Sequence, residues 1–342
     1  MSAALDFRLP PALEASAPPE DRGLPRDAVR LMVARGGAPL RHGVFRDLAA
    51  HLRPGDLVVV NESATIPAAV EAEREDGDRV QLHFSTPDPD GAGWLVELRR
   101  DGFRVVDGRA GEVLTLPGGA TATLAETEGA VPRLWRARLD LGGRAVLGYL
   151  AGHGAPIRYA HDLAERPLGA YQTLFSRVPG SAEMPSAGRP FTPRVLDGLA
   201  ARGVGVARLT LHTGVSSLEV GEPPYAERFA VPPATAAAVD ATHRAGRRVI
   251  AVGTTVTRAL ESAAAPDGTV RPASGWTDLT ITSERGVRAV DGLLTGWHEP
   301  EASHLLLLEA VAGRPLVERS YAAAVALGYR WHEFGDTHLL LP

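Results

Sequence analysis

The feature that most constrains the fold is an alternation of apolar strands and helices in the second half of the chain. FTPRVLDGLAARG predicts a helix that Thr192 caps and Pro193 begins. The strand VGVARLTLH at 204–212 follows, then PPATAAAVDATHRAG as a helix from Pro233, then the buried strand RVIAVG. This order of elements is typical of a mostly parallel sheet with helices packed against it.

A second pattern interrupts the first between about Ala69 and Gly148. RVQLHFS, GWLVELR, GEVLTL and LWRARLDL are short and rich in β-forming residues, and turn sequences such as DPDGAG and LPGGA separate them. Several short strands at this spacing predict a small antiparallel sheet or barrel. The segment therefore differs in architecture from what surrounds it.

Strand and helix patterns lie on both sides of this interruption. An apolar strand from Leu57 to Val60 precedes it, and helices are expected again at 302–312 and 315–327. We therefore predict an α/β fold in which a mixed α/β domain is interrupted by a smaller β-barrel-like domain. The predicted α/β domain consists of residues 1–68 and 149–342, and the inserted domain of residues 69–148.

Composition removes several classes of protein. The 342 residues contain no cysteine, so disulfides and thiolate metal sites are absent. The net charge of −5 gives no gross basic excess for nucleic acid, although a local basic patch stays open. No signal peptide is recognisable, and no apolar run reaches membrane-spanning length. We expect a cytoplasmic protein, a monomer or small homo-oligomer, with no membrane partner.

Polar side chains follow three of the apolar strands. Asn61 and Ser63 end the first, His212 follows the second, and Thr254 and Thr255 follow the third. In open α/β sheets ligands bind beyond the carboxyl ends of the strands. Polar residues are also common in ordinary turns, so a ligand site and plain loops both stay open.

The stretch RVIAVGTTVTRALES, 248–262, also has two interpretations, a ligand site or ordinary local structure. Gly253 permits a sharp turn, and Thr254 or Thr255 is expected to cap the helix that follows. Arg258 and Glu261 lie on one face of that helix. Either the helix terminus receives an anionic or polar ligand, or the stretch is a capped helix with a surface Arg–Glu pair.

A histidine-containing segment, VDGLLTGWHEPEAS, supplies further candidates. It brings Asp291, Thr295 and His298 into one short stretch, which suits a catalytic or ligand-orienting histidine. It is no zinc helix, because the second histidine of H-E-x-x-H is missing and Pro300 breaks the helical spacing. Ser186 lies in the Gly- and Pro-rich loop 171–191 and is either a ligand contact or a turn residue. No nucleotide-binding glycine motif occurs.

These segments together resemble the S-adenosylmethionine:tRNA ribosyltransferase-isomerases of queuosine biosynthesis. The resemblance covers about residues 5–340, and RVIAVGTT followed by R-x-L-E-S is highly specific. The other matching segments are RDAVRLMV, HGVFRDL, LRPGDLVVVNES, GAYQTLFSRVPGSAEMPSAG, LTLHTG, VDGLLTGWHEP and YRWHEFGDT. Members of the family have an α/β domain interrupted by a β-barrel domain.

The resemblance implies a transferase that uses S-adenosylmethionine as co-substrate and requires no metal. Family members transfer and isomerise its ribosyl part onto the aminomethyl group of a 7-deazaguanine in a tRNA anticodon loop. Epoxyqueuosine forms, and adenine and methionine leave. A base is needed because the sulfonium acidifies the C5′ protons, and adenine needs a proton or hydrogen-bond donor to leave. The implied catalytic candidates are His212, His298, Asp291 and Glu227. The implied substrate-binding residues are Asn61, Ser63, Tyr171, Gln172, Ser186, Gly253, Thr254, Thr255, Arg258 and Thr295.

Several positions depart from the family's motifs. Ala64 and Ala69 stand where the family has arginines, and Pro190 stands where it has a histidine. Arginines beside a site hold phosphates, so these departures bear on tRNA as the acceptor. Two alternatives therefore stay open. One is a paralogue that uses S-adenosylmethionine with a small-molecule acceptor or simply cleaves it, and the other is a non-catalytic relative that binds nucleoside or RNA.

Overall fold

The larger part of the molecule is built on a nine-stranded sheet. The computed structural model describes residues 5–342 except 92, 129–132, 143–144, 160–163, 216–224 and 301. The strand order is β16-β14-β13-β3-β15-β17-β18-β1-β2. Their bounds are β1 Arg30–Arg35, β2 Arg41–Val44, β3 Leu57–Asn61, β13 Gly205–Leu211, β14 Glu227–Val231, β15 Val249–Val252, β16 Ala273–Thr277, β17 Gly292–Thr295 and β18 Thr337–Leu341.

The centre of this sheet is parallel, as the strand–helix alternation predicts. β3 pairs in parallel with both β13 and β15, and β15 pairs in parallel with β17. The edges are mixed, because β14 and β16 run antiparallel on one side and β18 runs antiparallel to β17 on the other. Four carboxyl ends therefore meet at one edge of the sheet.

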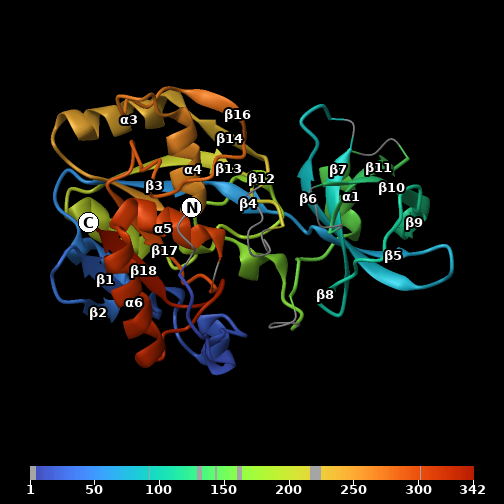
Figure 1. Ribbon diagram of the computed structural model, residues 1–342, viewed down its shortest axis with the longest axis horizontal. Coiled ribbons are helices and arrows are strands. Elements are labelled where there is room, and N and C mark those ends of the chain that lie inside the picture. The colour runs from blue at the N-terminus through green and yellow to red at the C-terminus, as the bar shows by residue number, and fades with distance from the viewer. Residues whose placement is uncertain are drawn as a thin grey trace.

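Helices cover both faces of the sheet (Figure 1). They are α2 Pro193–Ala201, α3 Pro233–Arg244, α4 Thr254–Ala263, α5 Ser303–Ala312 and α6 Arg314–Ala326. The predicted cap of α2 is confirmed, because Thr192 Oγ1 accepts a hydrogen bond from the Val195 amide at 3.4 Å. A 3-10 helix, η4 (Phe45–His51), precedes β3.

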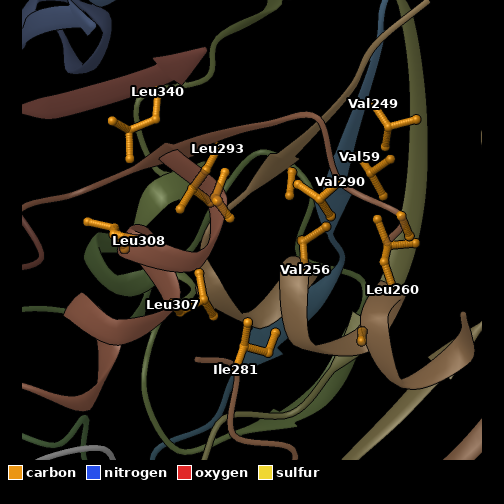
Figure 2. Close-up of a cluster of buried hydrophobic side chains, with 14 of the residues drawn as sticks. Val59, Val249, Val256, Leu260, Ile281, Val290, Leu293, Leu307, Leu308 and Leu340 are labelled. Atoms are coloured by element: carbon orange, nitrogen blue, oxygen red, sulfur yellow. The ribbon is translucent and has the colours of Figure 1, made fainter. Parts of the chain in front are cut away.

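The apolar runs of the central strands fill two cores, one on each face. Successive strand residues point to opposite faces, so an unbroken apolar run is buried on both. Val59 and Val249 lie in the core with α3, α4, α5 and α6, where Figure 2 shows them facing Val256 and Leu260 of α4. Val58 and Ile250, one position along, belong to the core with α2 and η4.

The smaller part is a β-barrel that lies beside the larger one (Figure 1). Its strands are β5 Ala69–Glu73, β6 Arg79–Pro87, β7 Trp94–Arg100, β8 Phe103–Arg104, β9 Val113–Leu116, β10 Ala120–Glu128 and β11 Leu134–Asp140. The order β11-β10-β9-β5-β6-β7 closes on itself because β11 also pairs with β7. Closure leaves no free edge along these strands. The predicted mixed α/β fold interrupted by a β-barrel is confirmed.

Two short elements connect the parts. β4 (Ser63–Thr65) and β12 (Val178–Ser181) form a parallel pair between them. Helix α1 (Val146–His153) packs on the barrel, since Tyr149 and Leu150 belong to the barrel core. The domain boundaries at residues 69 and 148 stay a proposal, and α1 crosses the second of them.

Candidate active site

A cavity of about 660 Å³ lies where the carboxyl ends of β15 and β17 face the β-barrel. The ends of these strands and the starts of α4 and α5 form one wall, and the barrel contributes Arg99, Phe103 and Arg104. The predicted site residues that line it are Ser186, Glu227, Gly253, Thr254, Thr255, Arg258, Thr295 and His298. Strand-end polar residues thus converge as the topology of the sheet requires.

The start of α4 forms part of the cavity wall. Gly253 stands at the N-cap with φ of 90°, a conformation that favours glycine, and its amide donates to Leu294 O at 2.7 Å. The prediction that Thr254 or Thr255 caps this helix is wrong, since α4 begins at Thr254 and no side chain of the described residues caps it. The first amides of α4 therefore keep their capacity for a ligand group.

Arg258 is buried and held by three acceptors. Its Nη1 donates to Glu227 Oε2, its Nη2 to Thr277 O at 3.0 Å and its Nε to Leu279 O at 3.2 Å. Glu227 Oε1 in turn accepts the Gly214 amide at 3.0 Å. The interpretation of Arg258 and Glu261 as a surface pair is wrong, because the partner of Arg258 comes from β14 and lies inside the protein.

Glu261, on the same helix, has a separate set of partners. Its carboxylate accepts Arg285 Nη1 at 2.9 Å and the amides of Arg288 and Ala289 at 2.8 Å. The Glu261 side chain is fully buried. It fixes the loop between β16 and β17 to α4 and does not line the cavity.

His298 combines a rigid backbone with a neutral ring. Its amide donates to Tyr321 Oη at 3.2 Å, and its carbonyl accepts Trp331 Nε1 at 2.9 Å. The ring Nε2 lies 3.0 Å from Thr295 Oγ1. Burial, together with the neighbouring His304, holds the pKa of His298 well below its usual value. At neutral pH the imidazole is therefore unprotonated, and one ring nitrogen is an acceptor.

His304 is a cavity residue that the sequence pattern did not reveal. Its ring stacks on His298 with centroids 4.8 Å apart and planes 9° from parallel. Burial, with Arg258 nearby, lowers the pKa of His304 to about 4. The signal in EASHLLLLE was only a histidine at a helix start, which by itself is typical of an ordinary polar surface position.

The barrel side of the cavity holds a second set of polar residues that the sequence did not reveal. Tyr159 Oη donates to Glu183 Oε1, and the Arg99 guanidinium lies 4.9 Å from the Tyr159 ring centroid. Arg99 Nε also donates to Glu97 Oε2 at 2.8 Å. Burial and the adjacent Glu183 raise the pKa of Tyr159 well above its usual value, so the phenol stays a donor.

His212, Ser63 and Asn61 lie behind the cavity wall. Ser63 Oγ is 2.7 Å from His212 Nδ1 and 2.6 Å from Ser181 Oγ. A β-carbon at Gly180 would come within 2.5 Å of His212 Nδ1, so the ring is tightly enclosed. Burial and Arg228 lower the pKa of His212 to about 4.

The side-chain amide of Asn61 forms hydrogen bonds with the backbone of the sheet. Its side chain donates to Leu211 O at 2.8 Å and accepts the Ser63 and Leu211 amides at 3.0 and 3.1 Å. A longer contact of 3.4 Å reaches Thr255 Oγ1. Asn61 therefore joins β3 to β13 beside the start of α4.

Three further predicted residues are not brought to the cavity. Gln172 donates to and accepts from the Thr65 backbone at 2.8 and 3.1 Å, and the Tyr171 carbonyl accepts Thr65 Oγ1 at 2.7 Å. Asp291 lies at the opposite end of β17, where it accepts the Val249 amide at 2.8 Å and contacts His243 Nε2 at 3.0 Å. A position just before a strand cannot face a site at the strand's carboxyl end.

Among the described residues, no group of three His, Asp or Glu side chains has the arrangement of a metal site. In the same part of the chain, none of the helices is both long enough and apolar enough to cross a membrane.

Comparison with known proteins gives one consistent result along the whole chain. Residues 2–340 match the family model described as "Queuosine biosynthesis protein". The S-adenosylmethionine:tRNA ribosyltransferase-isomerase of Symbiobacterium thermophilum is 39% identical, with 98% of each chain covered. The enzyme of the same name from Gluconacetobacter diazotrophicus is 39% identical over 99% of this chain and 96% of its own.

A solved structure agrees with these sequence matches. The crystal structure of the S-adenosylmethionine tRNA ribosyltransferase from Thermotoga maritima is similar with a TM-score of 0.55 and 28% identity. The match covers 98% of this chain and 99% of that one. The family and the fold thus agree from end to end, and the chain belongs to the queuosine biosynthesis protein family.

Proposed function

We propose that this protein is an S-adenosylmethionine-dependent tRNA ribosyltransferase-isomerase. It transfers and isomerises the ribosyl moiety of S-adenosylmethionine onto 7-aminomethyl-7-deazaguanine in tRNA, giving epoxyqueuosine and releasing adenine and methionine. The observation that carries the proposal is the cavity at the carboxyl ends of β15 and β17, in a chain that matches enzymes of this name over nearly its whole length.

The cavity suits S-adenosylmethionine in size and in charge. Its volume of about 660 Å³ lies within the range of small-molecule sites. The uncapped start of α4, with Thr254 and Thr255, is a site for the methionyl carboxylate, because helix amino termini favour anions. Glu183 and Glu299 also line the cavity and supply negative charge for the ammonium and the sulfonium.

The proposed general base is His298. It is neutral at physiological pH because burial lowers its pKa, and it lines the cavity beside Thr295. The contact between Nε2 and Thr295 Oγ1 orients the ring. Removal of a C5′ proton by His298 gives the carbanion beside the sulfonium that the isomerisation requires, and the proton stays on the imidazole.

Glu227 and Arg258 have a different proposed role. Both oxygens of Glu227 accept hydrogen bonds, so the carboxylate is committed to Arg258 and Gly214. Arg258 in turn bonds two carbonyls of the segment after β16. We assign the pair to positioning the wall of the cavity. His212 and Asp291 take no part in this proposal, because they contact Ser63 and the Val249 amide, which lie outside the cavity.

The departing adenine needs a hydrogen-bond donor at a ring nitrogen. Ser303 and His304 line the cavity, and the Ser303 hydroxyl and the His304 ring are the proposed donors. No metal has a role in this scheme.

The test is incubation of the protein with S-adenosylmethionine, with and without an anticodon stem-loop RNA that carries 7-aminomethyl-7-deazaguanine. The proposal predicts release of adenine and methionine only with the RNA. Release without RNA would favour a small-molecule acceptor or a lyase. Binding of S-adenosylmethionine without release under either condition would favour a non-catalytic relative. His298→Gln is the matched negative control for the chemical step.

A further inference from the structure

The β7–β8 hairpin presents an aromatic side chain at the rim of the active-site cavity. Phe103 is 65% exposed, the most exposed of the large apolar side chains among the described residues, and it lines the cavity. The turn is Asp101-Gly102, with φ of 50° and 78°. Positive φ at both positions is the geometry of a tight two-residue hairpin. Phe103 is therefore held out to solvent by a rigid turn.

Arg100 is the cross-strand neighbour of Phe103. The two residues face each other in the β7–β8 register, and opposite residues in an antiparallel pair point to the same face. Arg99 Nη1 donates to Gly102 O at 2.9 Å from inside the hairpin, which stiffens it. Phe103 and Arg100 thus oppose each other at the end of the hairpin, and of the two only Phe103 lines the active-site cavity.

The same hairpin also lines a second cavity. It has a volume of about 350 Å³ and shares Arg99 and Gly102 with the active-site cavity. Four arginines line it: Arg79, Arg99, Arg100 and Arg158. The two carboxylates that line it are Glu71, which accepts Gln81 Nε2 at 2.8 Å, and Asp101.

The arginines differ in their availability. Arg79 is exposed and forms no ion pair within the described residues, and Arg100 is 47% exposed although it pairs with Asp78. Arg99 is buried and committed to Glu97 and Gly102. Arg79 and Arg100 are therefore the two most exposed of the four arginines.

We propose that this hairpin is the docking surface for single-stranded RNA next to the modified base. The Phe103 ring stacks on a flanking nucleobase, and Arg79 and Arg100 contact its phosphate. The chemistry favours RNA because an exposed aromatic beside arginines matches a base beside its phosphate, and because the strip is continuous with the cavity that receives the reacting base. The inference rests on the proposed function and adds the surface that recognises the RNA.

The hairpin surface also carries the positive charge that positions 64 and 69 do not. Ala64 and Ala69 lie in or beside β4 and β5, where they carry no charge for phosphate. The barrel arginines provide that charge from a different element. Phosphate contacts carry most of the salt dependence of nucleic-acid binding. Mutation of the arginines therefore tests the phosphate contact separately from the stacking of Phe103.

The experiment measures binding of a labelled anticodon stem-loop containing 7-aminomethyl-7-deazaguanine by fluorescence anisotropy at several salt concentrations. The variants are Phe103→Ala, Phe103→Trp and the double variant Arg79→Ala/Arg100→Ala. Matched controls are Leu147→Ala, an exposed aliphatic residue of α1, and Arg109→Ala, an exposed barrel arginine outside both cavities. The Kd for S-adenosylmethionine is measured for each by calorimetry.

Phe103→Ala is expected to weaken RNA binding about 5- to 150-fold, the loss of one base–aromatic stack, while Phe103→Trp keeps it. The double arginine variant should reduce the log–log salt slope by about 0.7, since the two arginines contact one phosphate and each single-strand phosphate contributes about 0.7. Both controls should bind the RNA within about twofold of wild type, the scatter expected of surface changes. The Kd for S-adenosylmethionine of the double arginine variant and of both controls should stay in the same range, because none of these residues lines the active-site cavity.

Two results would overturn the inference, and only the second would also overturn the proposed function. If wild type modifies the RNA but Phe103→Ala and the double arginine variant bind it like wild type, the hairpin is not the docking surface and the proposed function stands. If wild type releases no adenine with the RNA, the proposed function fails and this inference fails with it.

Discussion

The prediction that the structure supports in most detail concerns Arg258. Replacing it by alanine leaves the Glu227 carboxylate buried without its cation and removes the donors of two carbonyls, Thr277 O and Leu279 O. The side chains of Arg258 and Glu227 are only 10% and 11% exposed, so little water replaces the lost bonds. Breaking a buried ion pair in this way costs about 3–5 kcal/mol of unfolding free energy.

The matched control is a surface ion pair of the same type. Arg314 Nε lies 2.8 Å from Glu318 Oε1 one turn along α6, and both side chains are well exposed. Glu318→Ala, which keeps the contact of Arg314 with the buried Glu309, should therefore cost about 0.3–0.5 kcal/mol. Arg258→Lys keeps the charge but cannot serve three acceptors in a plane, so it should fall between the two.

The assay is equilibrium urea unfolding followed by circular dichroism, with a double-mutant cycle using Glu227→Gln. The cycle should give a coupling energy of about 1–3 kcal/mol between Arg258 and Glu227, since contacting residues in one buried network couple in this range. A loss for Arg258→Ala no larger than that for Glu318→Ala would refute the reasoning, because it would mean that the buried network contributes nothing.

Three further predictions follow from single sites. His298→Gln should lower kcat about 10²- to 10⁴-fold, the usual contribution of a general base, while the Kd for S-adenosylmethionine by calorimetry changes little; an unchanged kcat would exclude His298 as the base. His338 is fully buried against Trp297, and burial lowers the pKa of its imidazole to about 3. The folded protein therefore disfavours the protonated ring, and unfolding free energy is lost as pH falls below about 6.5, the usual pKa of histidine. His338→Phe should therefore reduce the loss of unfolding free energy between pH 7 and pH 5 by about 2 kcal/mol, and an unaltered pH dependence in urea titrations would count against this. Thr192→Ala should cost about 1 kcal/mol of unfolding free energy by removing the cap of α2, whereas Thr192→Ser should cost much less in the same titration.

The fold was largely predictable because its signals are local. The Thr192–Pro193 start of α2, the Pro233 start of α3 and the apolar run of β15 each depend on a few neighbouring residues. Closure of the barrel depends instead on β7 pairing with β11 across a long stretch of chain, which local patterns do not encode. The pattern indicated a sheet or a barrel and could not choose between them.

The candidate site was predictable where a strand end defines it. Thr254, Thr295 and His298 follow apolar strands whose carboxyl ends meet, so topology brings them together. Asp291 shows the limit of this reasoning, because it is close to His298 in sequence but precedes β17 and so faces the opposite edge.

Residues contributed by other elements escaped prediction. Phe103 reaches the cavity because the barrel docks against the strand ends, and no quoted motif contains Phe103 or Tyr159. Glu183 lies in the matching segment GAYQTLFSRVPGSAEMPSAG, but nothing in that segment distinguished it from its neighbours. Arg258 was recognised as important, but its partner Glu227 lies 31 positions away on β14, so a helix-face argument paired it with Glu261 instead.

The most direct test of the proposed function is a single-turnover reaction with enzyme in excess over a 7-aminomethyl-7-deazaguanine stem-loop and S-adenosylmethionine. Mass spectrometry would quantify the RNA product, adenine and methionine from the same samples. The proposal predicts that all three form in equal amounts and that none forms with His298→Gln. Adenine and methionine accumulating while the mass of the RNA stays unchanged would contradict it.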